Sequence, residues 1–204
     1  MTSAIDAISP ISLDSAAADL LFKEAHTANT FTKEPVTKEE IQAIYELVKW
    51  GPTAFNAQPL RVVLVESEDA RTRLLNHVAE PNRPKTATAP IVAILVADTD
   101  FHENLERVLP HFPAAKSFFT ELSAREAFAK AQSWLQAGYF ILGIRAAGLA
   151  AGPMTGFDSD GVDADLLAGT TLKSIALVNI GHAGPDAFYP RSPRLDHDEV
   201  ISSL

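Results

Sequence analysis

A stiff polar loop between Pro52 and Pro59 is the first segment of this 204-residue chain whose residue types suit ligand binding. It reads PTAFNAQP and therefore carries one hydroxyl and two amide side chains. Pro59 restricts the residue before it to extended geometry. Such a loop presents hydrogen-bonding groups to a ligand, and an ordinary polar connection between a helix and a strand has the same composition.

Two further segments combine amide, lysine and glycine residues. Asn82 and Lys85 lie three positions apart, so both side chains can reach one ligand edge, and a solvated turn is the alternative. The segment Gly152–Asp158 reads GPMTGFD, and its two glycines allow a backbone amide to approach a flat ligand closely. A plain connection between two helices is the alternative for this segment.

Two arginines near the C-terminus stand out against an acidic background. Residues 151–204 include eight acidic residues and only three basic ones, and Arg191 and Arg194 are two of those three. A pair of guanidinium groups suits a phosphate or a carboxylate. The alternative is that each arginine pairs with a nearby acid such as Asp196 or Asp198.

Helical segments surround these candidates. A capping box, TKEE, predicts a helix over residues 37–50 that ends at a Gly-Pro pair. A second capping box, SARE, predicts a long helix over residues 123–147. From residue 137 to residue 147 this helix is apolar nearly all round, so we expect it to be central and buried. We also expect a helix over residues 15–27, capped by its first serine, and a short helix over residues 163–168.

Three segments have the composition of buried strands. Residues 62–65, 91–97 and 174–180 are near-continuous apolar runs, the pattern of strands that are covered on both faces. A few such strands among long helices predict an α+β fold with a central sheet of α/β type flanked by helices. We expect one domain over residues 15–204, after a flexible leader over residues 1–14.

The composition excludes several kinds of chemistry. The chain has no cysteine, which excludes disulfides, thiolate nucleophiles and iron–sulfur clusters with cysteine ligands. Any redox reaction therefore needs a bound cofactor. The formal net charge of -9 disfavours nucleic acid and anionic membranes as partners. We expect a cytoplasmic location, because the sequence resembles neither a signal peptide nor a membrane span.

Other familiar site motifs are missing or incomplete. No G-x-G-x-x-G sequence follows a predicted strand, so we expect no Rossmann dinucleotide site. The segment Gly169–Ser174 has leucine where a P-loop requires glycine. No G-x-S-x-G sequence marks a serine nucleophile, and the six histidines show no metal-ligand spacing, so we predict no metal site.

The four polar segments, in their order along the chain, resemble the motifs of the flavin-dependent nitroreductase family. The family loop P-S-x-x-N-x-Q-P is similar to Pro52–Pro59, and its N-x-x-K element is similar to Asn82–Lys85. The family element P-x-x-G-F is similar to Pro153–Phe157, and its C-terminal Arg-Leu to residues 194–195. The resemblance covers nearly the whole chain.

This resemblance implies a nitroreductase-like fold and an intertwined homodimer with FMN at the interface between the two chains. It also implies a ping-pong reaction in which NAD(P)H reduces the flavin at N5 and a small acceptor then takes the hydride, with no catalytic side chain required. The FMN-binding residues implied by the resemblance are His26, Thr27, Asn29, Thr53, Ala54, Asn56, Gln58, Asn82, Lys85, Pro153, Met154, Thr155, Gly156, Arg191 and Arg194.

The N-terminal element of the family carries two cations that this chain lacks. The family pattern R-x-S-x-R is matched by Ala25–Asn29, which contains no arginine. His26 would take part of the phosphate-binding role when protonated, because a phosphate favours the charged form. Weakened phosphate binding is the basis of one alternative, a flavin-binding module with little turnover.

A closer resemblance is to the malonic semialdehyde reductase branch of the family, which is linked to bacterial pyrimidine degradation. The residues that carry it are 49–53, 109–111, 152–158, 171–174 and 179–181. This branch implies the reduction of malonic semialdehyde to 3-hydroxypropionate. The alternative within the same enzyme class is reduction of nitroaromatic compounds or quinones.

Overall fold

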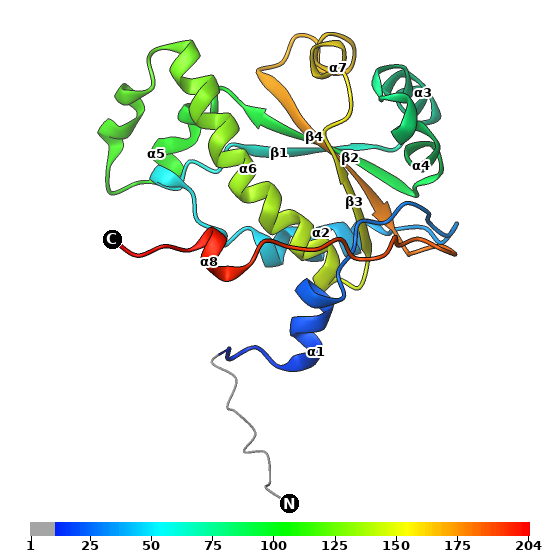
Figure 1. Cartoon of the computed structure of the whole chain (residues 1–204). Coiled ribbons are helices and arrows are strands. Elements are labelled where there is room, and N and C mark those ends of the chain that lie inside the picture. The colour runs from blue at the N-terminus through cyan, green and yellow to red at the C-terminus, as the bar shows by residue number, and fades with distance from the viewer. Residues whose placement is uncertain (1–10) are drawn as a thin grey trace, which may run out of the picture.

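A four-stranded antiparallel sheet is the centre of the described part of the chain (Figure 1). The computed structural model describes residues 11–204. The strands are β1 (Leu60–Val65), β2 (Ile91–Asp98), β3 (Ala150–Met154) and β4 (Leu172–Gly181), in the order β1-β2-β4-β3 across the sheet. Every neighbouring pair is antiparallel. Helices flank the sheet, so the predicted α+β fold is confirmed.

The sequence does not predict strand β3. The alternative considered for residues 152–158, a plain connection between two helices, is wrong, because the first residues of that segment lie in β3 and pair with β4. Glycine and proline are depleted in strands, which hides the pattern in the sequence. Pro153 is tolerated because β3 is an edge strand with one neighbour only.

Helices of very different lengths surround the sheet. They are α1 (Ser15–Ala18), α2 (Lys38–Val48), α3 (Glu68–His77), α4 (Arg83–Thr88), α5 (Leu105–Val108), α6 (Leu122–Ala146), α7 (Ser159–Leu166) and α8 (His197–Val200). A π-helical turn continues α1 over Asp19–Lys23, and 3-10 turns cover Ala54–Asn56, Glu80–Asn82, Phe101–Asn104 and Pro113–Phe118.

The capping box of α2 is confirmed, whereas the start of α1 differs from the prediction. The backbone N–H of Glu40 donates to the Thr37 hydroxyl (3.1 Å), and the N–H of Thr37 donates to the Glu40 carboxylate (2.7 Å). In α1 the capping side chain is Asp14, which accepts from the N–H of Ala17 (2.8 Å), and not Ser15. The α1 segment and its π-helical continuation also end earlier than residue 27.

Helix α6 begins before its expected start. The capping box at residues 123–126 is wrong, because the N–H of Arg125 already donates to the Glu121 carbonyl (3.0 Å) and the box lies inside the first turns. Gly148 follows the helix end as predicted, with a φ of 76° that favours glycine. The short helix expected over residues 163–168 is α7, shifted toward the N-terminus.

Two apolar clusters cover opposite faces of the sheet. Helices α2 and α6 contribute to the first cluster, and helices α3 and α7 to the second. Neighbouring residues of β2 alternate between them, as side chains on a strand must. The first cluster includes Ala93, Leu95 and Ala97, and the second includes Val92, Ile94 and Val96. The prediction that these strands are covered on both faces is therefore confirmed.

The outer surface of α6 is exposed in the single chain, so the prediction of a helix buried all round is wrong here. Trp134, Leu135 and Tyr139 are each between 38% and 46% exposed. Beside α6, the neighbouring α2 region exposes Tyr45 and Trp50. Exposed apolar patches of this size are typical of surfaces that another molecule covers.

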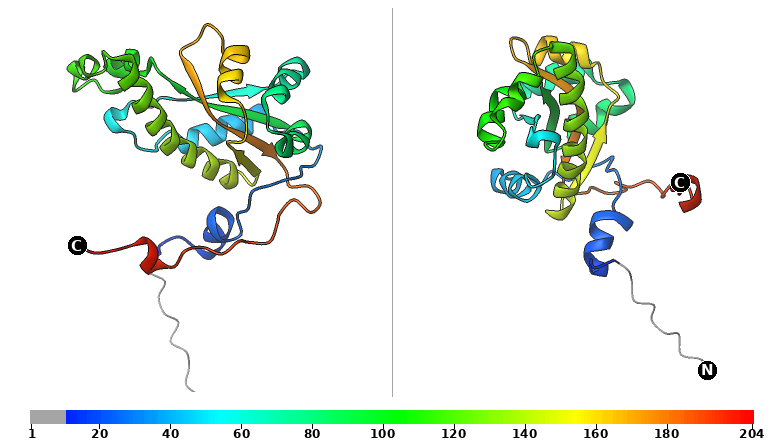
Figure 2. Two further views of the ribbon diagram at one scale, coloured as in Figure 1. Left: turned by 45° about the horizontal axis from the view of Figure 1, so that its top comes forward. Right: turned by 90° about the vertical axis from the view of Figure 1, so that its left-hand side faces the viewer.

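Both terminal segments extend away from the sheet (Figure 2). Residues 188–204 are exposed along their whole length. Residues 1–10 lie outside the described part of the chain, so a flexible leader over residues 1–14 stays a prediction. That residues 15–204 form one domain also stays a prediction.

Close packing between α2 and α6 leads to a test of the fold. A Cβ atom on Gly143 would overlap the Cγ1 atom of Val48 and lie 3.1 Å from the Cγ2 atom of Ile44. We expect Gly143→Ala to lower the free energy of unfolding by about 1–3 kcal/mol, because these side chains must move apart. Denaturant unfolding measures the change.

Gly138 provides the matched control on the same helix, since a Cβ atom there meets nothing within 4 Å. Gly138→Ala should raise stability by about 0.5–1 kcal/mol through helix propensity alone. Equal effects of the two substitutions would contradict the packing described for α2 and α6.

Candidate functional site

A hollow of about 310 Å³ brings the N-terminal and C-terminal candidate residues together. Its walls come from residues 25–29, from the last turn of α6 and from residues 189–194. The predicted residues that line it are His26, Thr27, Asn29, Arg191 and Arg194. Two segments that are far apart in the sequence therefore form one cation-rich surface.

Backbone hydrogen bonds hold the N-terminal wall of this hollow. The N–H of Ala28 donates to the Ala151 carbonyl on β3 (3.0 Å), and the N–H of Asn29 donates to the Ala187 carbonyl (2.9 Å). The ring of His26 lies against that of Phe188, with 5.6 Å between the centroids. Residues 25–29 are thus fixed between the sheet edge and the C-terminal segment.

The two C-terminal arginines bind backbone carbonyls. Arg191 donates to the carbonyl of Lys23 and, at 3.2 Å, to that of Ala25. Arg194 donates to the carbonyls of the two residues before it, at 2.8 and 3.2 Å. Neither guanidinium group forms an ion pair within residues 11–204, so both charges remain available to an anion.

The alternative in which nearby acids neutralise these arginines is wrong. The carboxylate of Asp198 contacts Nδ1 of His197 (2.7 Å). Asp196 caps the short helix α8, and its backbone N–H donates to the carboxylate of Glu199 (2.8 Å). Neither acid forms an ion pair with Arg191 or Arg194 within residues 11–204.

One basic residue of the hollow, Arg145, was not predicted from the sequence. Arg145 lies in the last turn of α6 and lines the same surface as Arg191 and Arg194. The only feature of the sequence that marks Arg145 is its position as a charged residue at the end of an otherwise apolar helix segment. Such a residue ordinarily indicates a favourable interaction with the helix dipole.

The second and third polar segments meet each other near the start of α4. The side-chain amide of Asn82 donates to the Gly156 carbonyl (3.2 Å), which also accepts from the N–H of Ala79 (3.0 Å). A Cβ atom on Gly156 would lie 2.5 Å from the Asn82 amide nitrogen, so only glycine permits this approach. Thr155 lies next to this contact and is exposed.

Lys85 lies on α4 and is partly buried, and burial lowers the pKa of its ammonium group. The residue after it, Thr86, is fully buried and its hydroxyl contacts the sulfur of Met154 (3.6 Å). The Met154 side chain belongs to the second apolar cluster, so its backbone alone can reach a ligand. The solvated turn considered for residues 82–85 is wrong, because these residues start a helix packed on β3.

Polar contacts of Asp158 and Asp165 with α3, together called the polar clamp, fix the position of the segment that carries Gly156. The N–H of Asp158 donates to the His77 carbonyl (2.8 Å), which ties this segment to the end of α3. On the same side, the carboxylate of Asp165 on α7 accepts from Arg73 (2.6 Å) and contacts Nε2 of His77 (3.0 Å). Helices α3 and α7 therefore hold the C-terminal end of the turn, and strand β3 leads into its other end.

The polar loop of residues 53–58 binds a different part of the chain. The side-chain amide of Asn56 donates to the Val108 carbonyl on α5 (2.7 Å), and the N–H of Ala54 donates to the Gln132 side chain on α6 (2.8 Å). Helices α5 and α4 lie at opposite ends of the sheet (Figure 1). A single chain therefore does not bring this loop to the other candidate residues.

The loop has an unusual backbone. Phe55, Asn56 and Gln58 have φ angles of 57°, 48° and 45°, a region that non-glycine residues rarely adopt. The extended geometry predicted for Gln58 is therefore wrong. Its N–H donates to the Thr53 hydroxyl (3.1 Å), and its carbonyl accepts from Arg61 (2.7 Å), which together hold the strained conformation.

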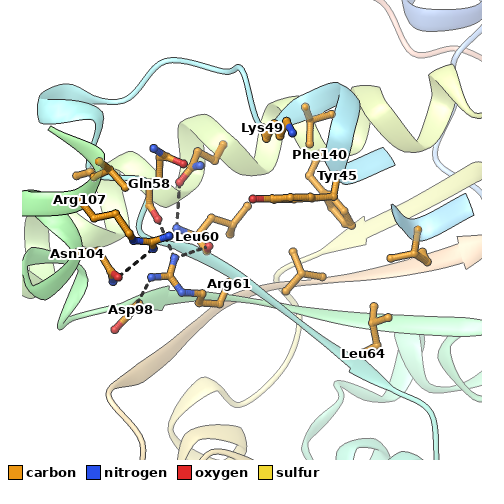
Figure 3. Close-up of a pocket in the computed structure, with 16 residues that line it drawn as sticks. Tyr45, Lys49, Gln58, Leu60, Arg61, Leu64, Asp98, Asn104, Arg107 and Phe140 are labelled. Atoms are coloured by element: carbon orange, nitrogen blue, oxygen red, sulfur yellow. Dashed lines mark hydrogen bonds and ion pairs between the residues drawn. The ribbon is translucent and has the colours of Figure 1, made fainter. Parts of the chain in front are cut away.

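A larger hollow of about 670 Å³ lies between α2, α6 and strand β1 (Figure 3). One end is polar, where Arg61 pairs with Asp98 (2.8 Å) and Arg107 contacts Asn104 (3.1 Å). The other end is apolar and includes Phe140. Among the predicted site residues, Gln58 alone borders it, so this hollow is separate from the cation-rich one.

Neither a membrane-spanning helix nor a cluster of metal-binding side chains is found within residues 11–204. No helix within residues 11–204 is long and apolar enough to cross a membrane. No group of three or more histidine, aspartate or glutamate side chains in this range has the arrangement of a metal site.

Comparisons with known proteins agree with this geometry. The sequence pattern of the Nitroreductase family matches residues 23–182. A Streptomyces griseus protein, provisionally named NADH dehydrogenase/NAD(P)H nitroreductase, is 62% identical over 193 residues, which cover 94% of this chain and 98% of that protein. A protein of the same provisional name from Leptothrix cholodnii is 47% identical over 193 residues, with the same coverage.

Solved structures share the fold at low sequence identity. A Bacillus subtilis nitroreductase-type protein has a TM-score of 0.83 at 23% identity, covering 94% of this chain and all of that one. A protein from Exiguobacterium sibiricum, solved in complex with FMN, has a TM-score of 0.81 at 22% identity, covering 95% and 98%. These likenesses concern the fold.

The fold, the hollow and the relatives together define an oxidoreductase. The chain belongs to the nitroreductase family.

The clamp around Asp165 generates a prediction about pH. The side chain of Arg73, and then that of His77, hold the pKa of Asp165 below its ordinary value of 3.8. A carboxylate whose pKa is lowered by folding stabilises the folded state fully when the pH is above its ordinary pKa. This stabilisation is lost as the pH falls through the lower pKa of the folded state. We expect Asp165→Asn to lower the melting temperature at neutral pH, by an amount that shrinks as the pH falls below 3.8.

Thermal unfolding at a series of pH values measures this difference. Asp160→Asn is the control, because Asp160 is exposed on the same helix and forms no ion pair with any residue from 11 to 204. If Asp165→Asn lowers the melting temperature by the same amount at every pH, the Asp165 carboxylate does not stabilise the fold through its charge.

Proposed function

We propose that the protein is an FMN-dependent NAD(P)H oxidoreductase. The observation that carries the proposal is the cation-rich hollow, which joins His26 to Arg191 and Arg194 in a chain with a net charge of -9. A phosphorylated cofactor explains why basic residues from both ends of an acidic chain converge there. The FMN in the Exiguobacterium structure and the NAD(P)H in the relatives' names support the choice of cofactors.

The described residues fit the parts of FMN. Arg191 and Arg194 would hold the phosphate, with His26, Thr27 and Asn29 on the opposite wall of the hollow. Lys85 would face the pyrimidine edge of the ring system, where the reduced flavin gains negative charge. FMN, when bound, supplies the hydride transfer, so no protein nucleophile is needed.

Backbone groups would complete this face of the site. Pro153, Met154 and Thr155 lead into Gly156, whose carbonyl accepts from Asn82. That bond fixes the direction of the peptide on either side of Gly156, so an N–H at this turn can be held toward the flavin. The clamp between α3 and α7 keeps the same turn in place.

A homodimer would supply the rest of the site. Thr53, Ala54, Asn56 and Gln58 lie at the end of the sheet opposite to α4, so the loop of a second chain would have to complete the site. The exposed aromatic side chains on α2 and α6 provide an apolar surface for such a partner. The protein would act in the cytoplasm, where NAD(P)H is available.

Two acceptors fit this proposal, and each has its own support. Malonic semialdehyde, reduced to 3-hydroxypropionate, is favoured by the sequence GPMTGFD at residues 152–158 and by the other segments that resemble the malonic semialdehyde reductase branch. Nitroaromatic compounds or quinones are favoured by the names of the relatives.

The visible spectrum of the purified protein tests the cofactor. We expect a yellow protein that absorbs near about 450 nm, the usual flavin band. Arg194→Ala should weaken FMN binding about 10- to 100-fold, because a charged hydrogen bond to the phosphate is lost. Lys130→Ala, which removes an exposed cation elsewhere on α6, should leave the affinity unchanged. A colourless protein that takes up no added FMN would refute the proposal.

Steady-state kinetics tests the acceptor. With NADH and NADPH as donors, kcat/KM is compared for malonic semialdehyde and for a nitroaromatic compound. We expect the aldehyde acid to be preferred by at least about tenfold, a difference of about 1.4 kcal/mol in transition-state binding. The opposite order would identify a nitroaromatic reductase, and no turnover despite bound FMN would support the non-enzymatic alternative.

A further inference from the structure

Arg145 is the residue of the cation-rich hollow whose hydrogen bonds are least complete. Its Nε atom is buried and has no hydrogen-bond partner in the described part of the chain. Its one recorded bond is a long contact of 3.4 Å from Nη1 to the carbonyl of Leu21. A buried donor without a partner costs free energy, so the Nε–H group of Arg145 is left unsatisfied by the described chain alone.

The charges around Arg145 make its position more unfavourable still. Burial and then the positive charge of Arg191 lower the pKa of Arg145, which shows that the two guanidinium groups repel each other. Glu24 and Arg145 both line a second, smaller hollow beside the cation-rich one, but they form no ion pair with each other. Arg191 and Arg194 likewise form no ion pair within residues 11–204. Three cations therefore converge without a counter-ion from the described chain.

A bound dianion would resolve both problems at once. It would accept hydrogen bonds from the guanidinium group of Arg145, and its charge would offset the repulsion between Arg145 and Arg191. The opposite wall contributes little positive charge, because residues 25–29 contain His26 and no lysine or arginine. Arg145 stands next to this wall and can supply the missing charge from the end of α6.

We propose that Arg145 binds the phosphate of FMN together with Arg191 and Arg194, and so replaces the N-terminal cations that this chain lacks. The inference rests on the proposed function, because it takes FMN as the ligand of this hollow. Its distinctive consequence is selectivity: Arg145 should favour FMN over riboflavin, which has the same ring system and no phosphate.

The test is the ratio of the dissociation constants for riboflavin and FMN, measured by quenching of flavin fluorescence in the full-length apoprotein. For Arg145→Met we expect FMN binding to weaken about 10- to 100-fold and riboflavin binding to change less than about twofold. The FMN affinity of the variant should also depend less on salt, because one charge contact is gone.

Lys130→Met is the matched control. It removes one positive charge from the same helix, about 22 Å along the axis from Arg145 at 1.5 Å per residue, and should leave the ratio unchanged. If Arg145→Met does not fold, Arg145→Gln removes the charge while keeping a donor for the Leu21 carbonyl, and the same ratio is measured. Arg145→Lys should restore part of the selectivity.

The outcomes separate this inference from the proposed function. If the wild-type protein binds FMN and the Arg145 variants keep the wild-type ratio, or lose both flavins equally, Arg145 has a structural role and the inference is wrong. If the wild-type protein binds neither flavin, the proposed function fails and the inference fails with it.

Discussion

The close approach of residues 25–29 to the edge of the sheet is the constraint on which the candidate site depends. Ala28 donates to the Ala151 carbonyl on β3, and a Cβ atom on Gly152 would lie 2.9 Å from the Ala28 carbonyl oxygen. Only glycine at position 152 lets the two backbones lie this close. Arg191 in turn donates to the Ala25 carbonyl, so the C-terminal segment is attached to the same stretch of backbone. One glycine in an edge strand thus allows the N-terminal wall of the hollow to lie against the sheet, and the C-terminal wall is attached to that segment through Arg191.

The candidate site is divided between two ends of the sheet. The turn at Gly156 is rigid because α3 and α7 clamp it, whereas the loop of residues 53–58 is rigid because α5 and α6 hold a strained backbone. Strain of this kind persists only where surrounding contacts over-determine it. The polar groups of that loop are therefore held in a fixed direction before any ligand arrives. The loop of residues 53–58 is thus rigid but lies far from the other predicted FMN-binding residues of its own chain. This arrangement suits a site to which a second chain contributes the loop.

Local sequence patterns predict those parts of the fold that local interactions decide. The capping box at Thr37 and the apolar strands are of this kind, since each depends on neighbours along the chain. Strand β3 could not be predicted, because the glycine and proline that disfavour a strand are tolerated only at the sheet edge. The conformation of Gln58 depends on distant bonds, to Thr53 and Arg61, that oppose the local preference. Arg145 was missed because its role depends on what lies opposite in space.

The net charge of -9 and a phosphate site are compatible because electrostatic interactions in a protein are local. Exposed charges more than about 8–10 Å away are largely screened by salt, whereas partly buried cations act through a medium of lower dielectric constant. Burial lowers the pKa of both Lys85 and Arg145, so the folded chain pays a free-energy cost to keep each of them charged. An anionic ligand recovers that cost on binding. A partly buried cation such as Arg145 can therefore act on a ligand in its own hollow more strongly than the more numerous exposed acids elsewhere on the chain.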